Sequence, residues 1–316
     1  MTAPGYLACN SASSSSANGN TNGNANDEVP IPPRLASLQI GKLLGTGSYA
    51  NVYLGTLQGV PVAVKALQQA AGPEAEQQLW AAHYEIMVAS DLSHPNIVPT
   101  IDWCGHFTPE QGGCTWVVQQ LCDCGSLSRA NAEGWFRMKA GNKPILRFVL
   151  ETALEIARGM QYLHEHGVIH GDLSSNNVLF VSADNDRMMT AKVIDFGMAR
   201  AMGLGAGSLQ TKSVGTISHV SPELLSNGQL SKSGDVYSFG VLCLEMWTGE
   251  RAWKGASIAQ VIFRISCRGE ALQAPDDVPE PLKSLMASCL GAAEKRPTFD
   301  DVVMQLEAML VGNGEE

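Results

Sequence analysis

Hydrophobic and polar residues alternate in short runs over the first half of the chain, and this pattern predicts a sheet. The β-branched, glycine-separated segments that show it are 38–45, 50–57, 60–66, 96–103 and 114–121. A hairpin loop is expected at 106–113, between the last two. Residues 73–92 differ, because proline and acidic residues are followed there by apolar residues at helical spacing. The first half is therefore predicted to be a five-stranded, mostly antiparallel sheet with one helix.

After Gly125 the apolar residues follow helical spacing. Residues 143–167 place them on one face of a predicted helix, with Gly167 as its C-terminal stop. A strand pair is expected around 191–197, followed by a long loop as far as Glu223. Four amphipathic segments predict the remaining helices, at 233–249, 258–269, 280–291 and 299–310. The second half is therefore predicted to be mainly helical, and it shows no internal repeat.

Residues 1–33 hold almost nothing that a core could bury. The run at 11–28 consists mainly of Ser, Asn and Gly, which cannot offset the entropy of ordering, so we expect it to be disordered. We divide the chain into this arm, an α+β domain at 34–312 and a tail at 313–316. The domain is predicted to have two lobes, an N-lobe at about 34–120 and a C-lobe at about 121–312.

Charge and cysteine content narrow the class of protein. The net charge of −10 argues against non-specific binding to nucleic acid or anionic membranes, and no apolar run approaches a membrane span of about 18 residues. Eight cysteines without a C-x-x-C pair favour reduced thiols over a zinc cluster. We therefore expect a cytoplasmic protein, with a nuclear or organellar location left open. His164 and His166 are expected to be ordinary polar surface residues.

A glycine turn and a lysine form the first group of candidate residues. Gly45 and Gly47 lie at a turn between strands, where a backbone without side chains can close over a phosphate. A flexible hairpin is the alternative. Lys65 lies in the apolar run VAVK, where it needs an anion such as Glu85 or a nucleotide phosphate. The alternative for Lys65 is that it reaches water past the strand edge.

Three oxygen-bearing side chains form the second group. Asp172 and Asn177 lie five residues apart in the stretch HGDLSSNN, and Asp195 follows a predicted strand in VIDFG. Oxygen atoms of Asn177 and Asp195 suit the preference of Mg²⁺. Asp172 would then be free to orient and deprotonate a hydroxyl.

Together these motifs resemble the eukaryotic protein kinase family over nearly everything beyond the arm. The resemblance implies a bilobal protein-kinase fold that uses ATP and Mg²⁺. It implies that Asp172 is the catalytic base and that Lys65, paired with Glu85, holds the α- and β-phosphates. It also implies that Asn177 and Asp195 bind magnesium. The residues expected around the nucleotide are Leu44, Gly45, Thr46, Gly47, Ala50, Val52, Ala63, Lys65, Gln120, Cys122 and Leu179.

Further matches lie outside these motifs. Gly215-Thr216 and Ser221-Pro222-Glu223 resemble the end of an activation segment, and Asp235 resembles the residue that anchors the catalytic loop. Arg296 resembles the arginine that pairs with Glu223. Gln119 resembles the residue beside the adenine pocket, where it would bond a ligand or neighbouring groups.

Two residues of the stretch HGDLSSNN depart from the family pattern. Gly171 replaces an Arg that often receives a phosphorylated loop residue, so we expect activity that needs no phosphate at this position. Ser174 replaces the Lys typical of Ser/Thr-specific members, so Ser174→Lys is expected to raise turnover. The loop DLSSNN is most similar to the tyrosine-kinase-like group of Ser/Thr kinases.

The implied function is transfer of the γ-phosphate of ATP to Ser or Thr hydroxyls of a protein substrate, with regulatory partners unknown. Two alternatives stay open. One is a weak or inactive pseudokinase that acts as a binding module. The other is a small-molecule phosphotransferase, since those enzymes also write the loop as H-G-D-x-x-x-x-N. The Phe196-Gly197 and Pro222-Glu223 pairs favour a protein substrate over a small molecule.

Overall fold

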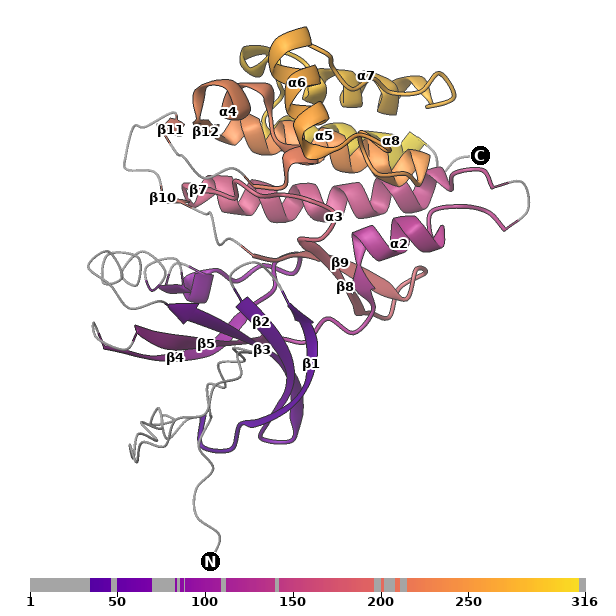
Figure 1. Ribbon diagram of the computed structural model, residues 1–316. Coiled ribbons are helices and arrows are strands. Elements are labelled where there is room, and N and C mark those ends of the chain that lie inside the picture. Colours follow the sequence, from indigo (N-terminus) through magenta and orange to yellow (C-terminus); the bar gives the residue numbers. More distant parts are fainter. Residues whose placement is uncertain are drawn as a thin grey trace, which may run out of the picture. The chain divides into compact units, whose positions relative to one another are not determined.

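Figure 1 shows a computed structural model of the chain. The residues that it describes are 35–46, 50–69, 83, 86–87, 89–108, 112–139, 142–195, 200–201, 208–210 and 215–312. Contacts divide the chain into two compact units. The first unit consists of Met1–Asp91 and Pro99–Leu121, and the second unit consists of Leu92–Val98 and Cys122–Glu316. No helix in the described ranges is both long and apolar enough to cross a lipid bilayer.

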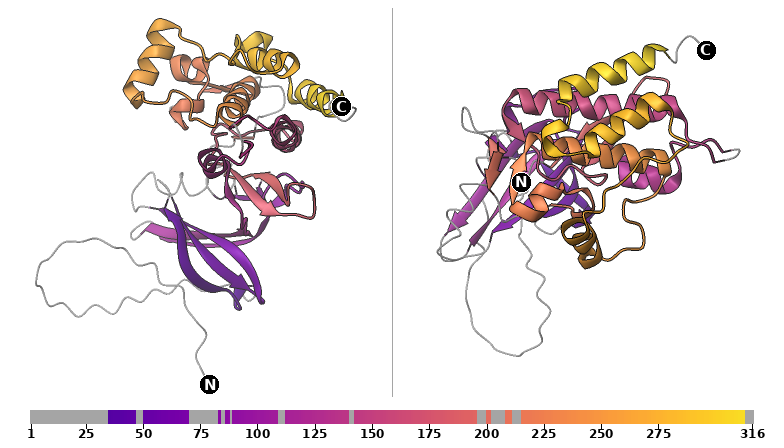
Figure 2. Two further views of the ribbon diagram at one scale, coloured as in Figure 1. Left: turned by 90° about the vertical axis from the view of Figure 1, so that its right-hand side faces the viewer. Right: turned by 90° about the horizontal axis from the view of Figure 1, so that it is seen from above.

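Five antiparallel strands form the sheet of the first unit, in the spatial order β1-β2-β3-β5-β4. They are β1 (Gln39–Thr46), β2 (Ala50–Leu57), β3 (Val60–Gln69), β4 (Thr100–Thr108) and β5 (Gly112–Gln120). This confirms the five-stranded sheet that the alternating segments predict. Figure 2 shows that the sheet is twisted and curved, as the handedness of L-residues requires.

One face of this sheet carries the hydrophobic core of the first unit. Val62 of β3 and Trp116 and Val118 of β5 are at most 5% exposed and belong to one apolar cluster. Successive side chains of a strand point to opposite faces of a sheet. Ala63 and Lys65 therefore point away from this core, to the opposite face of the sheet.

The chain before β4 differs from the prediction. The strand expected at 96–103 begins only at Thr100. Ile97 instead bridges Val193 of the second unit in parallel register, and the Val98 N–H donates to the Val193 carbonyl at 3.0 Å. Contacts distant in sequence overrule the local β-propensity here.

The hairpin and the helix of the first unit are described in part. β4 and β5 extend into the expected loop at 106–113, so the connection between them is shorter than predicted. Within the helix predicted at 73–92, the described residues 83, 86–87 and 89–91 are helical. The other positions of that helix lie outside the described residues.

Helices make up most of the second unit, as the apolar spacing predicts. The long ones are α3 (Leu146–Glu165), α5 (Lys232–Thr248), α6 (Ile258–Arg268), α7 (Glu280–Leu290) and α8 (Phe299–Gly312). Helix α3 packs along α8 and also contacts α5, which is buried over most of its length (Figure 2). The α+β fold with a mainly helical C-terminal lobe is thereby confirmed.

Short elements position the loops of the second unit. They are α2 (Leu127–Glu133), α4 (Pro222–Asn227), the 3-10 turns η2 (Ile217–His219) and η3 (Ala293–Lys295), and strands β6 (Gly125–Ser126), β7 (Val168–Ile169), β8 (Val178–Ser182), β9 (Met189–Val193), β10 (Arg200–Ala201), β11 (Ser208–Gln210) and β12 (Gln229–Ser231). The expected strand pair is β8 with β9, and β6 extends it to three strands. The apolar spacing missed α4, although Pro222 at its start and Gly228 after its end, with φ +66°, are typical helix signals.

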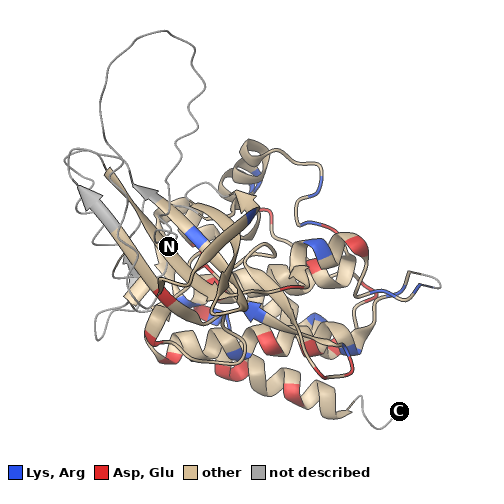
Figure 3. Ribbon diagram, turned by 90° about the horizontal axis from the view of Figure 1, so that it is seen from below, with Lys and Arg blue, Asp and Glu red and all other residues tan. Residues whose placement is uncertain are grey.

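Charged residues of both signs are interspersed along the described helices (Figure 3). Pairs four residues apart explain part of this pattern. Arg129 lies 2.7 Å from Glu133 on α2, and Arg147 lies 2.8 Å from Glu151 on α3. Such exposed pairs contribute little to stability individually.

Candidate functional site

Two hydrogen bonds hold the carboxylate of Asp172 in one orientation. The backbone N–H of Thr216 donates to Oδ1 at 2.6 Å, and Asn177 Nδ2 donates to Oδ2 at 3.1 Å. The same Nδ2 donates to the backbone carbonyl of Asp172 at 2.8 Å. Asp172 is half-buried, and a carboxylate oxygen can accept more than one donor. A fixed, reachable carboxylate is suited to accept a proton from a hydroxyl placed against it.

His170 is fully buried beneath this loop and connects it to the strand that leads to Asp195. The Asp172 N–H donates to His170 Nδ1 at 3.2 Å, so Nδ1 is the acceptor of the ring. Nε2 lies 3.1 Å from the carbonyl oxygen of Ile194, so Nε2 carries a proton. One tautomer of His170 therefore ties the loop to the residue before Asp195.

Asp235 anchors the backbone before Asp172 from the first turn of α5. Its Oδ2 accepts the His170 N–H and its Oδ1 accepts the Gly171 N–H, both at 2.9 Å. Oδ2 also lies 2.8 Å from His164 Nε2. His164 is buried, so the expectation that it is a surface residue is wrong. A buried carboxylate needs such donors to offset the loss of water.

The two candidate metal ligands lie at the open end of one hairpin. Strand β8 follows Asn177 and β9 leads to Asp195, with Val178 paired to Val193. The Ile194 N–H donates to the Asn177 carbonyl at 2.9 Å and extends the ladder by one residue. Asp195 has φ +65°, a left-handed conformation that is uncommon outside glycine and is often found at functional sites.

The donor atoms at this end fit a hard divalent cation. Asn177 Nδ2 is engaged by Asp172, which leaves the amide Oδ1 as the atom that can face a metal. Mg²⁺ is usually bound by one or two protein oxygens, with phosphate and water as the other ligands. No group of three or more His, Cys, Asp or Glu in the described ranges forms a rival metal site. Asn177 and Asp195 therefore stay the predicted magnesium ligands.

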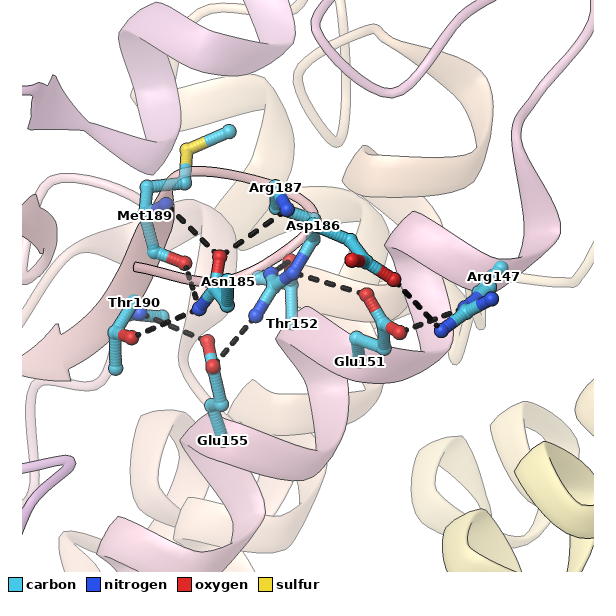
Figure 4. Close-up of polar contacts among 10 residues, drawn as sticks. Arg147, Glu151, Thr152, Glu155, Asn185, Asp186, Arg187, Met189 and Thr190 are labelled. Carbon is cyan, nitrogen blue, oxygen red and sulfur yellow. Dashed lines mark hydrogen bonds and ion pairs between the residues drawn. The ribbon is translucent and has the colours of Figure 1, made fainter. Parts of the chain in front are cut away.

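Arg187 fixes the closed end of the same hairpin to α3 (Figure 4). Its guanidinium lies 3.0 Å from Glu151 Oε2 and 2.5 Å from Glu155 Oε1. Glu155 Oε2 in turn accepts the Ala191 N–H of β9 at 2.8 Å. Burial raises the pKa of Glu155, although Arg187 and the Ala191 N–H oppose that rise. Helix α3 thereby holds both the turn and the second strand of the hairpin.

In the first unit, three predicted nucleotide residues lie in one row across the sheet. Gly45 of β1 pairs with Val52 of β2, and Val52 pairs with Lys65 of β3. Directly paired residues of antiparallel strands point to the same face. Ala63 shares this face because it lies two residues before Lys65. The face opposite the core therefore carries Lys65 in one row with Val52 and Gly45.

The remaining nucleotide candidates of the first unit lie at strand ends. Leu44 and Thr46 are exposed in the last residues of β1, and Ala50 begins β2. Gln120 ends β5. The preceding residue, Gln119, donates from Nε2 to Thr100 Oγ1 at 3.4 Å, so its side chain bonds a neighbouring side chain of the sheet. Two predicted residues, Gly47 and Glu85, lie outside the described residues.

Cys122 and Leu179 belong to the second unit. Leu179 is a half-buried residue of β8 and pairs with Lys192 of β9. Burial raises the pKa of Cys122 to about 11. A raised pKa favours the neutral thiol, which is a weaker nucleophile than a thiolate.

The two departures from the family pattern have different structural settings. Gly171 has φ +75°, a conformation that glycine adopts at no steric cost and arginine does not. Ser174 is 1% exposed, and its Oγ has no hydrogen-bond partner among the described residues. A lysine at this position would bury an ammonium group. The expectation that Ser174→Lys raises turnover stays a prediction, and the burial of this position adds an expected loss of stability.

Backbone pairing anchors the chain between Asp195 and Thr216 at two described places. Arg200–Ala201 pair with β7, and Ser208–Gln210 pair with β12. These ladders consist of main-chain hydrogen bonds, which need no phosphate. The expectation drawn from Gly171 stays a prediction. Phe196, Gly197, Thr211 and Ser213 lie outside the described residues.

Arg296 and Glu223 form the ion pair that the resemblance implies. Arg296 Nη1 lies 2.5 Å from Glu223 Oε1, and Nη2 donates to Oε2 at 3.0 Å. Nη1 also donates to the Ser233 carbonyl at 2.9 Å, and the guanidinium lies over the Tyr237 ring at 5.0 Å. Burial alone would raise the pKa of Glu223, but Arg296 outweighs it and holds this pKa below its ordinary value.

The sheet with its lysine row and the helical unit with its anchored Asp172 define a protein kinase domain. A family model described as protein tyrosine and serine/threonine kinase matches residues 38–306. The chain belongs to this family. The predicted resemblance to eukaryotic protein kinases is confirmed.

Several curated proteins are similar to this chain. Mitogen-activated protein kinase kinase kinase 11 of Homo sapiens is 33% identical over 290 residues, which cover 89% of this chain and 32% of that protein. Mitogen-activated protein kinase kinase kinase 13-B of Xenopus laevis is 31% identical over 265 residues, which cover 84% of this chain and 24% of that protein. Mitogen-activated protein kinase kinase kinase of Drosophila melanogaster is 31% identical over 279 residues, which cover 86% of this chain and 22% of that protein.

The chain therefore spans about a third or less of the length of these relatives. Their names support the predicted similarity to the tyrosine-kinase-like group of Ser/Thr kinases. The family and its relatives also support the predicted class of enzyme, an ATP-dependent protein kinase. Kinases of this family generally use ATP and Mg²⁺ and act on protein substrates.

Proposed function

We propose that this protein phosphorylates Ser and Thr hydroxyls of other proteins with ATP and Mg²⁺. The observation that carries the proposal is the fixed carboxylate of Asp172, held by the Thr216 N–H and by Asn177. Phosphoryl transfer requires mainly that the reactants are positioned and that negative charge is stabilised. The arrangement around Asp172 is suited to the first requirement.

Asp172 accepts the proton of the substrate hydroxyl in this proposal. Thr216 and Asn177 each occupy one of its oxygens, so the carboxylate cannot rotate away from the hydroxyl. His170 and Asp235 hold the backbone on which Asp172 lies. Each of these contacts reduces the entropy that must be lost when the substrate is aligned.

Lys65, Asn177 and Asp195 are proposed to hold the nucleotide. Lys65 lies in the row beside Gly45 and Val52, where its amine is suited to bind phosphate oxygens. Asn177 Oδ1 and the Asp195 carboxylate would bind Mg²⁺, which neutralises charge on the phosphates when it is bound. Glu85 remains the predicted partner of Lys65.

The substrate class can be narrowed with the relatives. Their names describe kinases that act on kinases, so we expect the acceptor protein to be a protein kinase itself. A cytoplasmic location, the arm at 1–33 and the domain limits at 34–312 stay predictions.

The proposal is tested by incubating the full-length chain with labelled ATP, Mg²⁺ and a mixed library of Ser, Thr and Tyr peptides. Label on Ser and Thr is expected, and Asp195→Ala should nearly abolish it. Label on Tyr alone, or unchanged transfer by Asp195→Ala, would contradict the proposal. Thermal unfolding with and without MgATP tests the alternative of a binding module, because a bound ligand raises the stability of the folded chain. No rise in stability, together with no transfer of label, would favour the binding module.

A further inference from the structure

His219 ends the 3-10 turn η2, which follows the residue that orients Asp172. The His219 N–H donates to the Thr216 carbonyl at 2.8 Å, and the Thr216 N–H donates to Asp172 Oδ1. Ser238 Oγ of α5 donates to the His219 carbonyl at 2.8 Å. The backbone of His219 is therefore tied both to α5 and to the residue that holds Asp172. A shift of His219 would reach the carboxylate through Thr216.

The side chain of His219 faces an acid of α5 without a hydrogen bond between them. His219 is 4% exposed, and Glu245 is 1% exposed. Nε2 of His219 lies 3.4 Å from Oε2 of Glu245, and neither atom has a hydrogen-bond partner among the described residues. Most buried polar atoms of folded proteins have a partner, because an unpartnered one is costly. Each of these two atoms is the partner that the other lacks, provided that their charges attract.

Glu245 supplies the negative charge of this contact. Its Oε1 accepts the Ala252 N–H at 2.9 Å, which fixes the orientation of the carboxylate. Burial alone would raise the pKa of Glu245, but the neighbouring His219 and the Ala252 N–H outweigh it and lower this pKa below its ordinary value of 4.5. Glu245 is therefore ionised over the range in which histidines ordinarily gain or lose a proton, between about pH 5 and pH 8.

Protonation of His219 changes what its ring offers to Glu245. A neutral imidazole carries hydrogen on one nitrogen only, and the hydroxyl of Ser218 lies 2.9 Å from Nδ1. When the ring takes up one proton from solvent, both nitrogens carry hydrogen. Nδ1 then donates to Ser218 Oγ, and Nε2 directs its hydrogen and a positive charge toward Glu245 Oε2. A buried cation and anion at this distance attract more strongly than they would in water, because little solvent screens them.

Two further acids lie near His219, and both are already engaged. Asp172 and Asp235 line a small internal space together with His219. Asp172 accepts one backbone N–H, and Asp235 accepts two. These bonds are made whether or not His219 is charged, so Glu245 is the acid that responds to its charge.

The cations around the pair are arginines, which keep their charge at ordinary pH. Two of them belong to α6, which packs against η2, and two border a cavity that Glu245 also lines. They are Arg264, Arg268, Arg129 and Arg251, and all four are exposed. They add a constant background that does not titrate with His219.

We propose that protonated His219 forms an ion pair with Glu245 that holds η2 on α5 and so keeps the Asp172 carboxylate oriented. His219 is then a positioning residue that makes phosphate transfer sensitive to pH. The proposal rests on the function proposed above, because His219 acts through Asp172 as the base. The ion pair is complete below the pH at which His219 loses its proton, and it is lost as the pH rises through that value.

The test compares the kcat of the full-length chain and of its His219→Gln variant, with saturating MgATP and one Ser/Thr peptide, at about pH 6 and about pH 8. Glutamine offers hydrogen bonds but carries no charge, and effects of pH on Asp172 itself cancel in the ratio of the two kcat values. The ratio of wild type to variant is expected to be at least about fivefold larger at the lower pH. On a Glu245→Gln background the same ratio should not change with pH.

His166→Gln is the matched control, because His166 is an exposed histidine at the end of α3 whose ring lies against Tyr162. The kcat ratio of wild type to this control should be the same at both pH values. A ratio of wild type to His219→Gln that is constant with pH would overturn the proposal. A pH-dependent ratio that persists on the Glu245→Gln background would overturn it as well.

Two measurements that need no catalysis separate this proposal from the proposed function. Urea unfolding of wild type, both single variants and the double variant gives the coupling between His219 and Glu245, which should decrease from about pH 6 to about pH 8. Nitrogen NMR of the wild type follows the charge of the His219 ring over the same range and needs no variant to fold. A ring that keeps one charge throughout this range would overturn the proposal.

The combined outcomes are distinct. A chain that transfers no phosphate but shows the pH-dependent coupling contradicts the proposed function alone. A chain that phosphorylates Ser and Thr without pH-dependent coupling contradicts the assignment of His219 and Glu245 alone. A chain that shows neither transfer nor coupling contradicts both.

Discussion

Gly215 lies so close to Asp172 that a Cβ atom on it would come within 2.5 Å of Asp172 Oδ1. The next residue, Thr216, donates its N–H to the same oxygen. The absence of a side chain at 215 therefore permits the contact that orients the candidate base. A glycine is required here by close approach rather than by backbone conformation.

Gly215→Ala is expected to displace the Asp172 carboxylate and to lower kcat by about a hundredfold, because small misplacements of reacting groups cost about that much. The KM for ATP should change little, since Gly215 does not belong to the row around Lys65. Steady-state kinetics with varied ATP measure both quantities. Gly312→Ala, at a glycine with open space around it, should leave kcat unchanged. An unaltered kcat in Gly215→Ala would show that this approach does not orient the base.

Ser174→Lys is expected to lower the free energy of unfolding by about 3 kcal/mol, because it places an unpaired charge at a buried position. Asn176→Lys is the control, since Asn176 is exposed two residues further along the same loop. Chemical denaturation of both variants compares the two positions. A Ser174→Lys variant that is as stable as Asn176→Lys would contradict the expected loss of stability, and faster turnover would support the interpretation drawn from the sequence.

Arg187→Met should destabilise the chain by about 3–5 kcal/mol, because it leaves Glu155 without its cation at a site where Arg187 is 4% exposed. Glu151 keeps its second partner, Arg147. Adding Glu155→Gln to this variant should recover part of the loss. Arg158→Met, on α3 like Glu151 and Glu155, breaks an exposed pair with Glu307 of α8 and should cost less than about 1 kcal/mol. Equal losses in the two single variants would mean that the hairpin does not depend on the buried network.

The Glu223–Arg296 pair predicts a loss of stability in acid. Arg296 holds the pKa of Glu223 below its ordinary value of 4.5, so the pair contributes fully above that value and is lost as the pH falls through the folded-state pKa. The difference in unfolding free energy between wild type and Glu223→Gln should therefore be largest near neutral pH and should narrow below about pH 4.5. Urea unfolding across this range measures it. A difference that stays constant with pH would exclude the ionised pair as its source.

Much of the fold follows from local pattern, and the exceptions have contacts that are distant in sequence. Helices α3 and α5 to α8 lie where apolar spacing predicts them, because one buried face is enough to specify a helix. The strand predicted at 96–103 loses its first residues because Ile97 bridges Val193, almost a hundred residues away. No window of local sequence contains that contact.

The candidate site, like the fold, follows partly from local sequence and partly from contacts between residues that are distant in sequence. The order of motifs is enough to select Asp172, Asn177 and Asp195, but not the contacts that hold them. The burial of His164 against Asp235 and of Ser174 depends on how α3 and α5 pack, which local sequence does not report. The anchoring role of Arg187 was equally hidden, because an arginine in a polar turn usually faces solvent.

Phosphate transfer by the full-length chain and its Asp172→Asn variant tests the central claim most directly. Both proteins are given labelled ATP, Mg²⁺ and a Ser/Thr acceptor, while ATP binding is measured in parallel. The account predicts that both bind ATP alike and that the wild type labels the acceptor at least about a hundredfold faster. A wild type that binds ATP without transferring phosphate, or an Asp172→Asn variant that transfers it at the wild-type rate, would contradict the account.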